Sequence, residues 1–158
     1  KMARLYGRCP QGQRCVTSVP HGHWQSSTFI AALRAERITA PFLIEGAVNA
    51  EVFTAYLEQV LCPELRRGDV VVLDNLSTHK IATVAALLAD RGATVRYLPP
   101  YSPDLNPIEM AFAKLKAHLR QAAARTLTDL QGALADSLQS FSPAHCRGFF
   151  RHAQYASI

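Results

Sequence analysis

The feature that most constrains the fold of this chain is a short apolar run, Val70–Leu73, which is followed by a carboxylate at Asp74. Three of its four residues are valines, and an unbroken β-branched run is typical of a strand that is buried on both faces. Such strands form the parallel part of an α/β sheet. Because open α/β sheets place their chemistry at the carboxyl ends of their strands, Asp74 is a candidate functional residue.

A second carboxylate, Glu109, follows a proline-rich loop. Asn106 is a preferred N-cap residue and Pro107 suits the first helical position, so Glu109 is predicted in the first turn of a helix. The two acids therefore lie on two well-fixed elements. Each also has a purely structural interpretation: Glu109 as the partner of Asn106 in a capping box, and Asp74 as a turn former at the strand end.

The other predicted elements alternate along the chain. A short strand is expected at 14–19, and two neighbouring strands, 24–33 and 38–44, are expected to form an antiparallel hairpin. Apolar periodicity predicts further strands at 70–73 and 94–98, and helices at 51–61, 80–91, 107–119, 127–141 and 143–155.

The residues around both acids resemble the second and third acidic motifs of DDE transposases of the mariner-like bacterial insertion-sequence superfamily (insertion-sequence family 630). The first segment reads DNLSTHK from Asp74, and the second reads LPPYSPDLNPIE up to Glu109. Between them, 109 − 74 − 1 leaves 34 residues, the interval typical of that group. The match continues upstream through PHGHWQSSTFIAALR and FLIEGAVNAEVFTAYLEQVL and downstream through FAKLKAHLR, so it covers most of the chain.

The resemblance implies an RNase H-like α/β fold, a mixed sheet flanked by helices. It also implies a DNA transposase catalytic domain, which performs metal-dependent phosphodiester cleavage and strand transfer at transposon ends. Such sites use two Mg²⁺ or Mn²⁺ ions held by acidic residues from separate elements. The motif match assigns the catalytic and metal-binding roles to Asp74 and Glu109. The implied partners are transposon-end and target DNA, bound by a homodimer.

The chain departs from the family at the first of its three acidic positions. In the family this Asp lies on the first, central strand, just upstream of the segment that resembles residues 1–14. No acid precedes Glu36 here, and neither Glu36 nor Glu45 matches the motif. We therefore expect a single RNase H-like domain over residues 1–158, truncated at its N-terminus. Without that strand, two sheet edges should stay unpaired around a gap in the core, the metal site should be incomplete and the chain alone inactive.

Two residues that follow Asp74 in the motif, Asn75 and His79, are candidates for DNA contacts. They could orient the Asp74 carboxylate or touch a phosphate. An equally simple role is to cap the following helix.

Two cations in the Glu109 helix are also candidates. Lys116 and Arg120 lie 7 and 11 residues after Glu109. At about 100° per residue they return to within roughly 20° of it on the helix. No acid occurs between residues 110 and 128. A solvated basic face is the ordinary role for such residues, but one aligned with a catalytic carboxylate is a candidate for contacts to the DNA backbone.

The charge of the chain favours a polyanionic partner. Its net charge is +5, and its first 35 residues carry five cations and no acid. No stretch approaches the roughly 18 apolar residues that a membrane span needs, and there is no signal peptide, so we expect a cytoplasmic, nucleoid-associated bacterial protein. The four scattered cysteines predict reduced, mostly buried thiols. The pair His21 and His23 predicts a loop rather than a metal site.

The sequence leaves two other functions open. The missing first Asp also fits a degenerate transposase remnant that at most binds DNA, without catalysis. A different RNase H-like nuclease, such as a resolvase, is a weaker alternative, because the SPDLNPIE loop and the 34-residue interval argue against it.

Overall fold

The computed structural model describes residues 6–16, 26–76 and 82–155 of the 158-residue chain. No helix in this described part is long and apolar enough to cross a membrane. The elements, in chain order, are β1 (Ser27–Leu33), β2 (Ile38–Glu45), α1 (Ala50–Tyr56), the π-helical turn η1 (Leu57–Leu61), the 3₁₀ turn η2 (Cys62–Glu64), β3 (Val70–Leu73), α2 (Ala82–Asp90), β4 (Thr94–Tyr97), the 3₁₀ turn η4 (Pro103–Leu105), α3 (Pro107–Ala122), α4 (Leu127–Gln139) and α5 (Pro143–His152).

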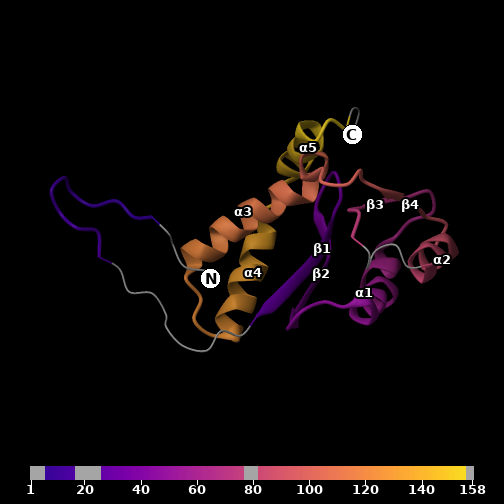
Figure 1. The fold of residues 1–158 in the computed structure, drawn as a ribbon, viewed down its shortest axis with the longest axis horizontal. Coiled ribbons are helices and arrows are strands. Elements are labelled where there is room, and N and C mark those ends of the chain that lie inside the picture. Colours follow the sequence, from indigo (N-terminus) through magenta and orange to yellow (C-terminus); the bar gives the residue numbers. More distant parts are fainter. Residues whose placement is uncertain (1–5, 17–25, 77–81, 156–158) are drawn as a thin grey trace.

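The antiparallel hairpin β1–β2 lies at the centre of the molecule (Figure 1). Its strands pair from Ser27 opposite Glu45 to Leu33 opposite Ile38, so the predicted hairpin is confirmed. Successive side chains of a strand point to opposite faces. Both faces of this hairpin carry apolar side chains, and each face packs against its own cluster of helices.

One face of the hairpin packs against the cluster that contains α1 and η1, and η1 in turn contacts α2. Ile30 and Ala32 of β1 contact this cluster, and Leu57, which is fully buried, belongs to its core. The helix α1 begins as the sequence predicts, because the Asn49 side chain accepts a hydrogen bond from the backbone N–H of Val52 at 2.9 Å. This cap satisfies one of the backbone donors that a helix leaves open at its start.

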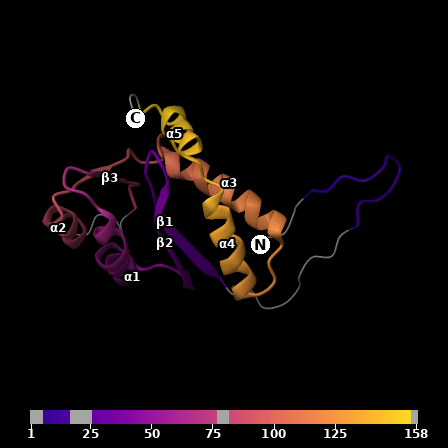
Figure 2. The same ribbon diagram turned by 180° about the vertical axis from the view of Figure 1, so that it is seen from behind.

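The opposite face packs against α3, α4 and α5, as the view from behind also shows (Figure 2). Phe29 and Leu33 of β1 contact this second cluster. The ring of Phe29 meets that of Phe112 on α3 edge to face, with ring centroids 6.0 Å apart. Leu115 and Leu119 of the predicted α3 stripe are buried here. The helix that carries Glu109 is therefore fixed on the hairpin.

Strands β3 and β4 form a separate, two-stranded sheet. They run parallel, with Val70 opposite Thr94 and Leu73 opposite Tyr97, so the prediction that 70–73 is a parallel strand is confirmed. The prediction that β3 is buried on both faces is wrong. Val70 is 58% exposed and the rest of the strand is half-buried. The reason is that β3 has a partner strand on one edge, whereas a cavity runs along its residues between this sheet and the hairpin.

Residues 6–16 extend away from the body of the molecule (Figures 1 and 2). The strand predicted at 14–19 is not formed by its first three residues, and its last three lie outside the described residues. His21 and His23 lie outside them as well. This part of the sequence therefore has β-forming residues without a neighbouring strand to pair with in the described structure.

All four cysteines are free, but they are not mostly buried. Cys62 and Cys146 are buried, whereas Cys9 and Cys15 are exposed. Burial raises the pKa of the Cys62 thiol, which stays protonated. The exposed pair belongs to the extending segment, where no core is available to cover it.

An ion pair joins the hairpin to the β3 sheet. Arg34, which follows β1, donates to both carboxylate oxygens of Asp69, which precedes β3, one of them at 3.2 Å. Arg34 also donates to the Glu64 carbonyl at 2.9 Å, and Asp69 accepts the Arg66 backbone N–H at 2.8 Å. The hydrogen bonds from Arg34 are the main cause that lowers the pKa of Asp69.

We expect Asp69→Asn to lower the free energy of unfolding by about 1.5–3 kcal/mol at neutral pH, the range for hydrogen bonds to charged groups. Because the pKa of Asp69 is lower in the folded chain, its stabilising contribution is present above the unfolded pKa of about 3.9 and is lost as the pH falls through the folded value. Urea unfolding of both proteins at pH about 7 and about 3 measures this. A difference that stays constant between the two pH values would contradict the prediction.

Candidate active site

Asp74 follows the last residue of β3 and is half-buried. Its Oδ1 accepts a hydrogen bond from the backbone N–H of Leu76 at 3.2 Å. The turn-forming role that the sequence suggested is therefore observed. It does not remove the residue from a functional role, because Asp74 also lines the cavity between the two sheets.

Glu109 lies in the first turn of α3, with Asn106 as N-cap and Pro107 in the first position, as predicted. The Asn106 side chain makes no capping hydrogen bond, so the capping-box interpretation of Glu109 is wrong. The helices α4 and α5, in contrast, begin with complete capping boxes at Thr126 and Ser142. The Glu109 side chain is exposed, and within the described residues no hydrogen bond or ion pair engages its carboxylate. A carboxylate in this position is also favoured by the helix dipole.

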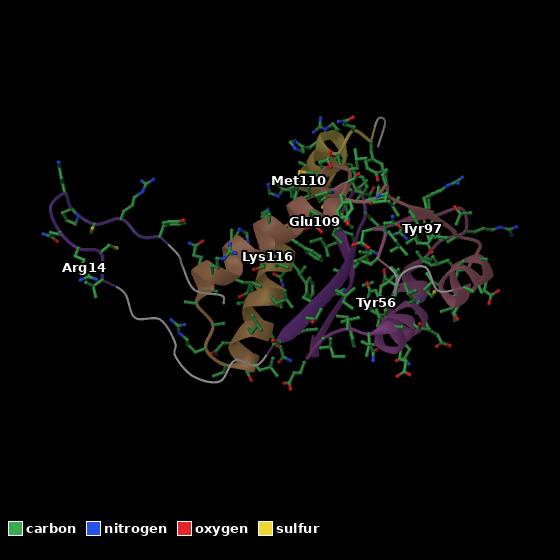
Figure 3. All side chains as sticks on the ribbon, viewed as in Figure 1. Arg14, Tyr56, Tyr97, Glu109, Met110 and Lys116 are labelled. Atoms are coloured by element: carbon green, nitrogen blue, oxygen red, sulfur yellow. The ribbon has the colours of Figure 1, made fainter. Side chains whose placement is uncertain are left out.

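The two carboxylates line a single cavity of about 540 Å³. One wall is formed by residues 29–35 of β1 and its end, and the facing wall by residues 69–74 of β3 and its ends. The start of α3, from Asn106 to Glu109, closes part of the rim. Figure 3 places Glu109 near the upper end of α3, on the side of the hairpin. The fold thus places on one cavity two acids that are separated by 34 intervening residues in sequence.

The cavity separates two strands that have no partner on their facing edges within the described residues. There β1 pairs with β2 alone, and β3 pairs with β4 alone. Protein interiors seldom contain voids much larger than a water molecule. A cavity of this size along two strands marks an interruption of the sheet. The expectation of unpaired edges and a gap in the core is therefore confirmed for the described part of the chain.

A third acid lines the cavity, but it is Asp69, at the other end of β3. At about 3.3 Å per residue, the five steps from Asp69 to Asp74 span roughly 16 Å, and Arg34 already binds the Asp69 carboxylate. Glu36 and Glu45 do not line the cavity. In the described ranges no three His, Cys, Asp or Glu side chains gather into a set that could hold a metal ion.

Tyr56 lines the cavity from the α1 side, where Figure 3 labels it. Its hydroxyl donates to the Ala40 carbonyl at 3.0 Å. Burial raises the pKa of Tyr56, so the phenol stays neutral and acts as a fixed donor to the hairpin. Its role is to support the cavity wall rather than to exchange protons.

The predicted DNA-contacting residues are placed only in part. Asn75 is half-buried beside Asp74, and His79 lies outside the described residues. Lys116 is exposed and Arg120 is half-buried on α3, which runs unbroken over 16 residues. The continuous helix keeps both cations on the side of Glu109 that the sequence predicts, and Figure 3 shows Lys116 further along the helix.

The last helix also reaches the cavity, which the sequence did not reveal. Phe150 and Tyr155 line it, with their rings edge to face and 5.6 Å apart between centroids. The periodicity of α5 indicates an apolar face. It carries no information about which neighbour that face meets, so no signal in the sequence connects this segment to the two acids.

Solved structures with a similar fold come from the Mos1 mariner transposase. The Mos1 strand transfer complex aligns with a TM-score of 0.72 and 17% identity, over 96% of this chain and 46% of that chain. The Mos1 mariner paired-end complex with Mn aligns with a TM-score of 0.68 and 18% identity, over 96% of this chain and 47% of that chain. The Mos1 catalytic domain with Raltegravir and Mg aligns with a TM-score of 0.65 and 15% identity, over 82% of this chain and 78% of that chain. The likeness confirms the predicted RNase H-like fold, and the chain spans about half the length of the first two chains.

No curated protein matches the sequence. A family model described as DDE superfamily endonuclease matches residues 1–131. The match includes both the Asp74 strand end and the Glu109 helix, and it covers 131 of the 158 residues. The chain belongs to the DDE superfamily of endonucleases.

Proposed function

We propose that this chain is the catalytic part of a DNA transposase, which cleaves phosphodiester bonds at transposon ends and transfers the strands to target DNA. The observation that carries the proposal is the shared cavity of Asp74 and Glu109, which come from two separate elements of a DDE-family chain. The Mos1 strand transfer complex and the Mos1 paired-end complex with the left transposon end support the same chemistry by analogy.

Asp74 and Glu109 are the residues that would hold Mg²⁺ or Mn²⁺. Their oxygens are the hard donors that these ions prefer, and the Glu109 carboxylate is not engaged by another described side chain. Bound ions of this kind activate an oxygen nucleophile and neutralise charge on the phosphate. The chain itself contributes rigid placement: the Leu76 N–H orients Asp74, and the first turn of α3 orients Glu109.

The 158-residue chain by itself is expected to be inactive. The family uses three acids, and this chain supplies the second and third. Asp69 cannot replace the first, because Arg34 neutralises it at the far end of β3. A complete site requires a further carboxylate from a segment that also fills the space between β1 and β3.

DNA is the proposed partner, with the transposon ends held by a homodimer. Lys116 and Arg120 are proposed to contact the phosphate backbone along α3, with Asn75 and His79 beside Asp74. The paired-end complexes of Mos1 support a dimeric arrangement. The competing proposal, a remnant that at most binds DNA, is favoured by the absence of the first acid from residues 1–35.

Mn²⁺ titration by calorimetry tests the metal site, on this chain and on the longest natural form that its gene encodes. Binding should be at least about tenfold tighter in the longer form, because a third carboxylate adds a charged ligand. Asp74→Asn and Glu109→Gln should each remove that gain. Glu51→Gln is the matched control, since Glu51 lies in the first turn of α1 and does not line the cavity.

DNA cleavage is measured as nicking of supercoiled plasmid in the presence of Mn²⁺. We expect none from the 158-residue chain, and cleavage by the longer form that both site variants abolish. If neither form binds Mn²⁺ in a manner that depends on Asp74, the chain is a scaffold without this chemistry and the remnant proposal is correct.

The DNA face is tested with Lys116→Gln/Arg120→Gln. Removing two phosphate contacts should reduce the slope of log K against log salt by about 1.8, at about 0.9 per contact. Fluorescence anisotropy with a labelled duplex measures it. The control Arg67→Gln/Arg91→Gln removes the same two charges at the amino end of the β3 sheet, away from Asp74. Both residues are exposed there, and the slope should stay unchanged. Equal effects of the two pairs would count against a specific face on α3.

A further inference from the structure

The final helix, α5, borders the candidate active site. Phe150 and Tyr155 line the cavity together with Asp74 and Glu109. In Figure 1, α5 lies beside the end of α3 at which Pro107 begins the helix, and the view from behind agrees (Figure 2). The segment that contains α5 is therefore part of the wall of the cavity that the two carboxylates line.

The helix is held firmly in this position. Cys146 is fully buried between α5 and its neighbours, in the cluster that also contains α3. Lys114 of α3 donates to the carbonyl of Ser140 at 3.1 Å, and its ammonium lies 4.6 Å from the ring centre of Phe141. These contacts lock the start of α5 onto the helix that carries Glu109. The exposed residues of α5 thus keep a fixed position relative to Glu109.

The exposed side of α5 carries two arginines that have no acidic partner in the described part of the chain. Arg147 and Arg151 are both exposed and, being four residues apart, share one face of the helix. Neither forms an ion pair within the described residues, whereas Arg34 and Arg37 do. No Asp or Glu occurs between residues 137 and 158, so neighbouring acids in sequence do not neutralise them.

We propose that Arg147 and Arg151 form a phosphate-binding edge that grips the DNA backbone beside the candidate active site. The inference rests on DNA being the partner in the proposed function, and it adds a second element to the Lys116 and Arg120 face of α3. Guanidinium groups bind phosphate oxygens in a bidentate manner. At 1.5 Å per residue the two arginines are about 6 Å apart along the axis, so each can reach a different phosphate.

A structural role for the same residues gives a different result. Arg151 lies in the last turn of α5, where a cation stabilises the helix dipole. If that were its whole function, neutralising it would lower the melting temperature and leave DNA affinity and its salt dependence unchanged. A phosphate-binding edge requires the opposite pattern, a change in salt dependence that is larger than any change in stability.

The test is Arg147→Gln/Arg151→Gln in the 158-residue chain, with a fluorescein-labelled duplex of about 20 base pairs titrated over a range of salt concentrations. We expect the slope of log K against log salt to fall by about 1.8, and affinity at about 0.1 M salt to fall by at least roughly tenfold. The control is again Arg67→Gln/Arg91→Gln, with the same loss of two charges. Circular dichroism and thermal melting establish that each variant is folded.

The possible outcomes separate this inference from the proposed function. If the wild-type chain does not bind the duplex, the DNA partner of the proposed function fails, and this inference fails with it. A second outcome is that the wild type binds and Lys116→Gln/Arg120→Gln weakens this binding, whereas Arg147→Gln/Arg151→Gln has the same effect as the control pair. In that case only the α5 edge is overturned. A change in slope confined to the α5 variant and the α3 variant supports both.

Discussion

The two-sided packing of strand β1 is the constraint on which the rest of the structure depends. Because successive side chains alternate in direction, Phe29 enters the cluster with α3 while Ile30 enters the cluster with α1. Glu109 is carried by a helix on one of these faces, and Asp74 by a strand that borders the other. Their common cavity is therefore a consequence of one hairpin supporting two cores. The Arg34–Asp69 ion pair fixes the end of the cavity that lies away from Asp74.

The gap between β1 and β3 affects both the stability of the fold and the composition of the candidate metal site. Strand edges present backbone groups that need partners, and the facing edges of β1 and β3 have none among the described strands. The cavity walls between them are largely apolar, with helices behind both faces. A strand in that space would pair both edges and cover both faces at once. If, as the proposed function requires, such a strand carried the missing carboxylate, it would complete the sheet and the metal site together.

The basic side chains fall into two groups, those that form ion pairs and those that are exposed on helices near the site. Arg34 is bound to Asp69, which precedes β3, and so joins the hairpin to the β3 sheet, whereas Arg37 is bound to Glu64 of η2. Lys116 on α3 and Arg147 on α5 are exposed on helices that meet near Glu109. The first pair contributes to stability, and a change in it is expected to alter unfolding. The second group is free of acidic partners within the described residues, as a polyanion-binding surface requires.

Local sequence signals determined the elements and the two acids. Asn49 and Pro107 set helix starts, the valine run at 70–72 set the parallel strand, and the loop before α3 set the position of Glu109. These signals are local because capping and periodicity act over a few residues. The tertiary structure alone decided that Arg34 binds Asp69 while the Glu109 carboxylate is not engaged by another described side chain. It also decided how far β3 is exposed and that α5 ends beside the cavity. Those outcomes depend on packing between distant segments, because an apolar face specifies burial without specifying the neighbour that provides it.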